Sequence, residues 1–260
     1  MTNYTPYELI GAERRGKFVI TCDHASNIVP EDVGGGSLGL PAADMERHIA
    51  YDIGAEGVAR ALGEALEAPV ILSRFSRLVI DPNRGEHDPT LLMRLYDGTI
   101  IPTNRHADAA ELARRVAAYY LPYHRAISAV FAERPDAALI SMHSYTPQLR
   151  GRPVRPWQVG VLSAHDRRLS EAVIDQLGQA DFAAWVAETT GAALCIGDNQ
   201  PYSGHLPGDS VDRHALQFNR QNTLIELRND LIATEADQIA WATRLGPVIT
   251  KALAAVESQS

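Results

Sequence analysis

Two histidines lie just past short apolar runs that are typical of buried strands. His24 follows the run Phe18–Cys22, and His143 follows Ala137–Met142. Neutral imidazole nitrogens are ligands that Zn²⁺ prefers in proteins. A single histidine in such a position more often caps a turn, but two of them at strand ends favour a metal site. We therefore assign both as candidate metal ligands.

The third ligand is left open among residues of the following segment. His48 and Asp52 are four residues apart, so on a helix they share one face. His48 is taken as the third ligand, and Asp52 and the weaker candidate Glu46 are alternatives. A His–Asp pair on a helix surface, with no metal, explains the same spacing equally well.

Arginines around one proline-containing turn indicate a local anion site. Arg77 and Arg84 flank a short apolar run, and Arg84 follows Asn83 directly. A guanidinium beside a side-chain amide can grip a carboxylate, because arginine presents a planar fork of donors. Arg155 adds positive charge from a later loop. We expect all four side chains to bind an anionic substrate, although a structural ion pair with Asp81 also fits this turn.

Glu226 interrupts the apolar run Thr223–Leu227. Burial raises the pKa of a carboxyl group, and a general base that activates water has this requirement. A structural pair with Arg228 on the same strand face is the alternative. We assign Glu226 as the catalytic base.

The composition excludes several classes of protein. Of the 260 residues, 45% are hydrophobic and 22% are charged, which is ordinary for a globular protein. The net charge of -8 argues against binding to nucleic acid or an anionic membrane. No apolar run is long enough for a membrane span and no signal peptide is visible, so we expect a cytoplasmic protein. The oligomeric state stays open.

Short β-branched runs alternate with Ala-rich helical stretches along the chain. This order predicts an α/β fold, a three-layer sandwich around a largely parallel mixed sheet, in one domain over residues 1–260. Strands are expected at 18–22, 69–72, 78–80, 137–142, 157–162, 194–196 and 223–227, and helices at 44–66, 106–133, 167–177 and 235–256. Ligands of such sheets bind at the carboxyl ends of the strands, where His24 and His143 lie.

Six segments, taken together and in this order, resemble the N-formylglutamate amidohydrolase family. They are Cys22–Pro30, His48–Gly54, Ser76–Arg84, Met142–Pro147, Asp198–Gly204 and Ile225–Asp230. The likeness is closer to the broad, poorly characterised branch of that family than to its histidine-degradation enzyme. The family is similar in turn to zinc carboxypeptidases and aspartoacylases, so the resemblance implies a phosphorylase/hydrolase-like fold.

The resemblance also implies metal-dependent hydrolysis of an amide on an amino acid. By analogy, His24 and His143 hold Zn²⁺ or another divalent ion, and Glu226 activates water. Zinc carboxypeptidases and aspartoacylases place a glutamate three residues after the first histidine, where this chain has Asn27. A neutral amide is a poor substitute, so a third ligand must come from another part of the chain.

The same resemblance assigns the substrate contacts. Asn83 and Arg84 grip the substrate carboxylate, Arg84 also helps to stabilise the oxyanion, and Asn199 and Tyr202 lie at the pocket. The expected activity is hydrolysis of a small anionic N-acyl amino acid such as N-formylglutamate, which releases formate or another acid. A carboxypeptidase-like peptidase and a non-catalytic binding protein of the same fold are the alternatives.

Overall fold

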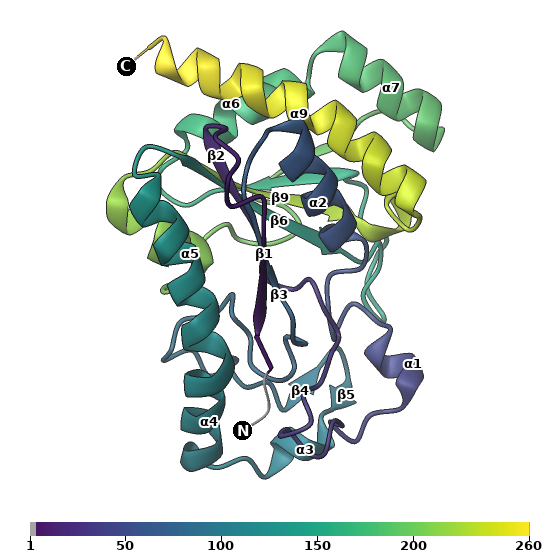
Figure 1. Ribbon diagram of the computed structural model, residues 1–260. Helices are drawn as coiled ribbons and strands as arrows, with labels where there is room; N and C mark the ends of the chain where they lie inside the picture. Colours follow the sequence, from purple (N-terminus) through teal and green to yellow (C-terminus); the bar gives the residue numbers. More distant parts are fainter. Residues whose placement is uncertain (1–3, 260) are drawn as a thin grey trace.

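The computed structural model describes residues 4–259, which are organised around a seven-stranded sheet (Figure 1). The strand order is β1-β3-β2-β6-β9-β7-β8. The strands are β1 (Tyr7–Ile10), β2 (Phe18–Cys22), β3 (Val70–Ser73), β6 (Ala138–Tyr145), β7 (Val159–Leu162), β8 (Ile196–Asp198) and β9 (Asn222–Arg228). Neighbouring strands are parallel except for β1 with β3 and β7 with β9. The predicted α/β class with a largely parallel mixed sheet is confirmed.

Helices cover both faces of this sheet. They are α1 (Ala42–Met45), α2 (Ala55–Ala65), α3 (Pro102–Arg105), α4 (Ala109–Arg115), α5 (Leu121–Glu133), α6 (Arg168–Leu177), α7 (Ala180–Thr190), α8 (Ser210–His214) and α9 (Glu235–Glu257). A π-helical turn, Val116–Tyr120, joins α4 to α5. Along β2 the side chains alternate between the two faces. Ile20 belongs to the core under α2, α6 and α9, and Val19 to the core under α5 and α8.

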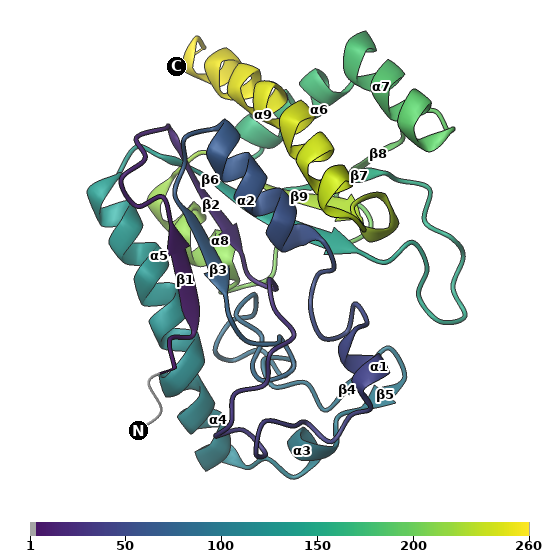
Figure 2. The same ribbon diagram turned by 45° about the vertical axis from the view of Figure 1, so that its right-hand side comes forward.

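The remaining elements lie outside these layers. The short helices α1 and α3 lie beyond one end of the sheet, together with the hairpin of β4 (Leu95–Tyr96) and β5 (Thr99–Ile100) (Figure 2). Within residues 4–259 none of the helices combines the length and the apolar character that crossing a membrane requires.

Four predicted elements differ from the structure. The helix expected over 44–66 begins only at Ala55, and residues 46–54 form turns. The strand expected over 78–80 is a buried turn, in which the amide of Val79 donates to the carbonyl of Ser76. The helix expected over 106–133 is divided by the π-helical turn, with Pro122 near the start of α5. The expected strand 194–196 shifts to β8, and neither β1 nor α7 was expected.

Gly54 explains why the predicted helix starts late. It caps α2 in the left-handed conformation, with φ of 79°. A Cβ atom added there would lie 2.3 Å from the carbonyl oxygen of Ile232 and 2.9 Å from its Cγ1. Only glycine tolerates both the backbone angle and this close approach, so the chain turns sharply between Asp52 and α2.

We expect Gly54→Ala to destabilise the fold by about 2–4 kcal/mol, because a left-handed residue with a Cβ costs about 1–2 kcal/mol and displacement of the Ile232 carbonyl adds to it. Urea denaturation measures the loss. Gly191→Ala is the matched control, since Gly191 also has a positive φ of 70° but no atom within 4 Å of an added Cβ. Equal losses in the two variants would contradict the steric argument.

Candidate functional site

Three adjacent strands bring the central side chains of the site together. β2 and β6 are parallel neighbours, so their carboxyl ends meet at one edge of the sheet and carry His24 and His143. The two imidazole rings have centroids 5.0 Å apart. Across the next pair of strands, β6 and β9, Glu226 stands opposite His143 in the register. This edge therefore holds both predicted histidine ligands and the predicted base.

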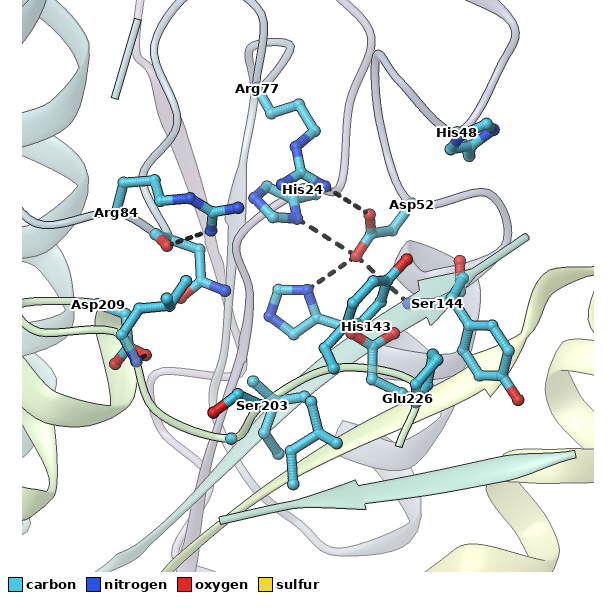
Figure 3. Close-up of a pocket in the computed structure, with 18 of the residues that line it drawn as sticks. His24, His48, Asp52, Arg77, Arg84, His143, Ser144, Ser203, Asp209 and Glu226 are labelled. Carbon is cyan, nitrogen blue, oxygen red and sulfur yellow. Dashed lines mark hydrogen bonds and ion pairs between the residues drawn. The ribbon is translucent and has the colours of Figure 1, made fainter. Parts of the chain in front are cut away.

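Asp52 lies between the two histidines (Figure 3). Its Oδ2 atom is 2.8 Å from Nδ1 of His143 and 3.3 Å from Nδ1 of His24. All three side chains are buried, and one ligand atom of each lies within 4.8 Å of the others. Two imidazole nitrogens and a carboxylate oxygen thus converge on one point, which is the donor set of a catalytic zinc site with an open position.

The outer ring nitrogens of both histidines contact further buried carboxylates. Nε2 of His24 is 2.7 Å from Oδ1 of Asp81, and Nε2 of His143 is 3.1 Å from Oγ of Ser141 and 3.4 Å from Oδ2 of Asp23. A carboxylate at Nε2 favours the proton on that nitrogen and leaves the Nδ1 lone pair for a metal. The residues present therefore fit a divalent cation in tautomer as well as in geometry.

The charges of this cluster are strongly shifted. Burial alone would raise the pKa of Asp52, but His24 and His143 hold that pKa well below its ordinary value. Burial alone would lower the pKa of His143, but the hydrogen bonds with Asp23 and Asp52 raise it well above its ordinary value. In the absence of a metal, a proton on His143 balances the carboxylates. A divalent ion would displace that proton, so metal binding and protonation compete.

Arg77 fastens two of these carboxylates. Its Nη2 donates to Oδ2 of Asp81 at 2.8 Å, and its Nη1 lies 3.5 Å from Oδ1 of Asp52. The side chain is 7% exposed. These ion pairs occupy the guanidinium that we expected to bind substrate, although Arg77 does line the cavity.

Glu226 faces the same cavity without a full set of partners. It is buried, and its Oε2 atom has no hydrogen-bond partner among the described residues. Burial raises the pKa of Glu226 to about 8, although His143 opposes the shift. A buried polar atom without a partner is rare in folded proteins. This geometry suits a group that receives a proton from a ligand in the cavity.

The cavity measures about 420 Å³. Its lining contains His24, His48, Asp52, Arg77, Asn83, Arg84, Tyr96, His143, Ser144, Tyr145, Thr146, Leu162, Pro201, Tyr202, Ser203, Gly204, Leu206, Asp209, Leu224 and Glu226. Arg84 is partly exposed, and its Nε donates to Oγ1 of Thr90 while Nη1 donates to the carbonyl of Asn83. No contact of its Nη2 is found among the described residues, so the guanidinium retains donors for a carboxylate.

His48 lies away from the convergent ligands. It lines the cavity, but its Nε2 is 3.4 Å from Oδ2 of Asp97 on the β4–β5 hairpin, and it is not part of the His24–Asp52–His143 group. The helix that would have put His48 and Asp52 on one face does not form there. Of the three alternatives for the third ligand, the structure brings only Asp52 to the two histidines.

Asn27, in the position of the expected glutamate ligand, has a structural contact instead. Its Nδ2 donates to the carbonyl of Met45 at 3.0 Å and to Oε1 of Glu46 at 3.2 Å. It thereby anchors the start of the segment that leads to Asp52. Glu46 is occupied by this contact and by Tyr51.

Two predicted substrate contacts do not line the cavity. Oδ1 of Asn199 accepts from the amide of Ser163 at 2.9 Å, so this side chain closes a loop. Arg155 donates to the hydroxyl of Tyr202 at 3.1 Å and stacks over its ring. Tyr202 itself does line the cavity.

The sequence reasoning missed Asp23, and it weighed Asp81 only as a structural partner of an arginine. Asp23 directly precedes His24, and Asp81 begins the segment that carries Asn83. An aspartate one or two residues before each of these candidate residues is the signal that could have found them.

A buried histidine pair supports the loop that carries Asn83 and Arg84. Nε2 of His124 is 3.1 Å from the carbonyl oxygen of Pro82, so this nitrogen must donate. Nδ1 of His124 then accepts from Nε2 of His214 at 2.8 Å. Burial lowers the pKa of His124 well below its ordinary value and lowers the pKa of His214 to about 4. Both rings are thus neutral in the folded protein.

Comparisons with known proteins show the family and the fold of this chain. A model of the N-formylglutamate amidohydrolase family matches residues 16–233. A gene product of Agrobacterium tumefaciens of known structure is 35% identical, with a TM-score of 0.87, and the alignment covers 98% of this chain and 97% of that one. The N-formylglutamate amidohydrolase from Ralstonia eutropha shares the fold at 20% identity, with a TM-score of 0.58 and 98% of each chain covered. No curated protein matches the chain.

We expect Asp52→Asn to weaken zinc binding by about 100-fold or more, because the amide lacks the charge of the ligand that joins the two histidines. Isothermal titration with Zn²⁺ measures the affinity, and the zinc-dependent rise in Tm provides an independent measure. His48→Gln is the matched control and should bind zinc as the native protein does. The reverse pattern would make His48 the ligand and would contradict the geometry.

We expect the native protein to lose stability in mild acid through His214. Its folded pKa of about 4 lies below the unfolded value of ~6.5, so its contribution is complete above pH ~6.5 and is lost as the pH falls toward 4. Over that window the loss is about 2–3 kcal/mol. His214→Gln keeps a donor for His124 but cannot titrate, so urea denaturation should show a shallower pH dependence. Parallel pH profiles would rule out this contribution.

Proposed function

This chain belongs to the N-formylglutamate amidohydrolase family, and we propose that it is a metal-dependent hydrolase that cleaves the amide of a small N-acyl amino acid. The observation that carries the proposal is the convergence of His24, Asp52 and His143 beside an unpartnered Glu226. Arg84, on the same cavity, supplies the charge for a substrate carboxylate.

His24, Asp52 and His143 would hold the divalent ion, for which Zn²⁺ is the best fit to the donor set. When bound, the ion would supply Lewis-acid chemistry that polarises the amide carbonyl and makes water more acidic. Asp81 and Asp23 hold the two imidazoles in the required tautomer. Arg77 keeps the Asp52 and Asp81 carboxylates in place.

Arg84 and Asn83 orient the substrate. The guanidinium pairs with the α-carboxylate, and this contact fixes the amide over the centre of the cavity. Glu226 accepts a proton from the attacking water and returns it to the leaving nitrogen. The C–N bond breaks, the acyl group leaves as formate or another acid, and the amino acid leaves with a free amine.

We expect Glu226→Gln to lower kcat by about 10²–10⁴-fold, the usual contribution of a general base, while zinc binding is retained. The assay is release of free amine from a panel of N-formyl and N-acetyl amino acids that includes N-formyl-L-glutamate. Glu188→Gln on the exposed face of α7 is the matched control. In the native protein a strong chelator should abolish turnover and added Zn²⁺ should restore it. Full turnover with the chelator present would refute the proposal.

A further inference from the structure

The cavity extends past the centre of the site to a wall of aromatic side chains. His48 and Tyr96 meet edge to face, with ring centroids 6.2 Å apart. Tyr145 and Tyr202 complete this wall, and Arg155 lies over both rings, 5.5 Å and 4.9 Å from their centroids. We call these four cavity-lining residues, His48, Tyr96, Tyr145 and Tyr202, the aromatic wall.

His48, at one end of the aromatic wall, and Arg84 lie on different sides of the central ligands. Figure 3 shows Arg84 on one side of His24 and Asp52, and His48 on the other. Tyr96 is the ring partner of His48, and Arg77 lies 5.3 Å from the Tyr96 centroid. A molecule that spans the cavity therefore touches a cation at one end and rings at the other.

Among the described residues that line the cavity, the aromatic wall offers a carboxylate no free cation. Arg77 is committed to Asp81 and Asp52. Arg155 is not one of the cavity-lining residues, and its Nη1 donates to the carbonyl of Thr146 and to the hydroxyl of Tyr202. Burial lowers the pKa of His48, so its ring is neutral at pH 7. A substrate carboxylate is consequently directed to Arg84.

This asymmetry fixes the direction of the substrate. The scissile carbonyl carbon carries the amide nitrogen on one side and the acyl substituent on the other. With the α-carboxylate on Arg84, the nitrogen and the α-carbon occupy the Arg84 side, so the acyl substituent points toward the aromatic wall. A formyl group has only a hydrogen there and would leave the wall uncovered.

We propose that the aromatic wall is an acyl-binding subsite, an inference that rests on the proposed function. It would hold a flat, apolar acyl group larger than formyl, such as an aryl or arylacetyl group. Rings that pack edge to face or offset against tyrosines gain from their quadrupoles as well as from burial. A cavity of about 420 Å³ is within the range of about 300–1,000 Å³ that holds ligands of this size. The cleaved bond and the products are otherwise those of the proposed reaction, with an aryl carboxylic acid in place of formate.

The test compares N-formyl-, N-acetyl-, N-benzoyl- and N-phenylacetyl-L-glutamate as substrates of the zinc-loaded protein. We expect kcat/KM for the better aryl substrate to exceed that for N-formyl-L-glutamate by about tenfold or more, since even one methylene in an apolar pocket is worth about 10–200-fold. An equal or higher value for the N-formyl substrate would overturn the subsite. If N-formyl-L-glutamate is then still hydrolysed in a chelator-sensitive reaction, the proposed function stands and only the subsite fails. If none of the four is cleaved, the subsite fails, and the proposed function fails with it when no member of the wider N-formyl and N-acetyl panel is cleaved.

A set of variants assigns the preference to the aromatic wall. Tyr202 is 36% exposed, so Tyr202→Ala removes a ring without opening the core. We expect it to lower the ratio of aryl to formyl kcat/KM by about tenfold, and Tyr202→Phe should restore most of that ratio. Phe218→Ala removes a ring that is 61% exposed and lies outside the cavity lining, and it should leave the ratio unchanged. An unchanged ratio in Tyr202→Ala would contradict the subsite.

Discussion

The carboxylate of Asp52, buried between two imidazoles, is the interaction on which the rest of the site depends. Two histidines from adjacent parallel strands direct the same ring nitrogen at its Oδ2 atom, while Arg77 approaches its other oxygen. Burying such a group is costly unless every neighbour is paired. Two further features hold this arrangement in place. Asp23 and Asp81 hold the outer nitrogens of the histidines, and Gly54 permits the turn that carries Asp52 to the sheet edge.

The charges of this network explain why a divalent cation suits it. The carboxylates of Asp23, Asp52 and Asp81 contribute three negative charges, and Arg77 contributes one positive charge. The buried cluster therefore has two excess negative charges when both imidazoles are neutral. A proton on His143 balances one of these two charges. A divalent ion balances both and leaves the imidazoles neutral, which is the state in which they bind metal. Arg84, 3.9 Å from Asp81 and partly exposed, adds charge only at the rim, where a substrate carboxylate can reach it.

How far the sequence predicts this site depends on the kind of pattern. The sequence could place three residues at one sheet edge: His24, His143 and Glu226. Parallel strands align their carboxyl ends, and side chains in a strand alternate between the two faces with a period of two residues. The sequence could not decide between His48 and Asp52. The comparison of the two residues assumed helical spacing, but Gly54 starts the helix late and the segment before it forms turns. The apolar run 78–80 is buried, but an apolar run alone does not distinguish a strand from a buried turn. Long-range contacts, such as those of Asn199 with Ser163 and of Arg155 with Tyr202, leave no local signal in the sequence.

Asn27, and not a glutamate, occupies the position three residues after His24, and this difference bears on how the site is coupled to its surroundings. A ligand three residues after His24 would belong to the same strand end, and the metal centre would need little else. Here the third group of the centre comes from the segment 46–54, which Asn27 anchors at Met45 and which also carries His48. His48 in turn contacts Asp97 on the β4–β5 hairpin, as does Arg47. The same stretch of chain therefore positions both Asp52 and His48, so a shift of the hairpin would move both. If the proposed metal and the proposed acyl group bind here, one connected segment would contact both of them.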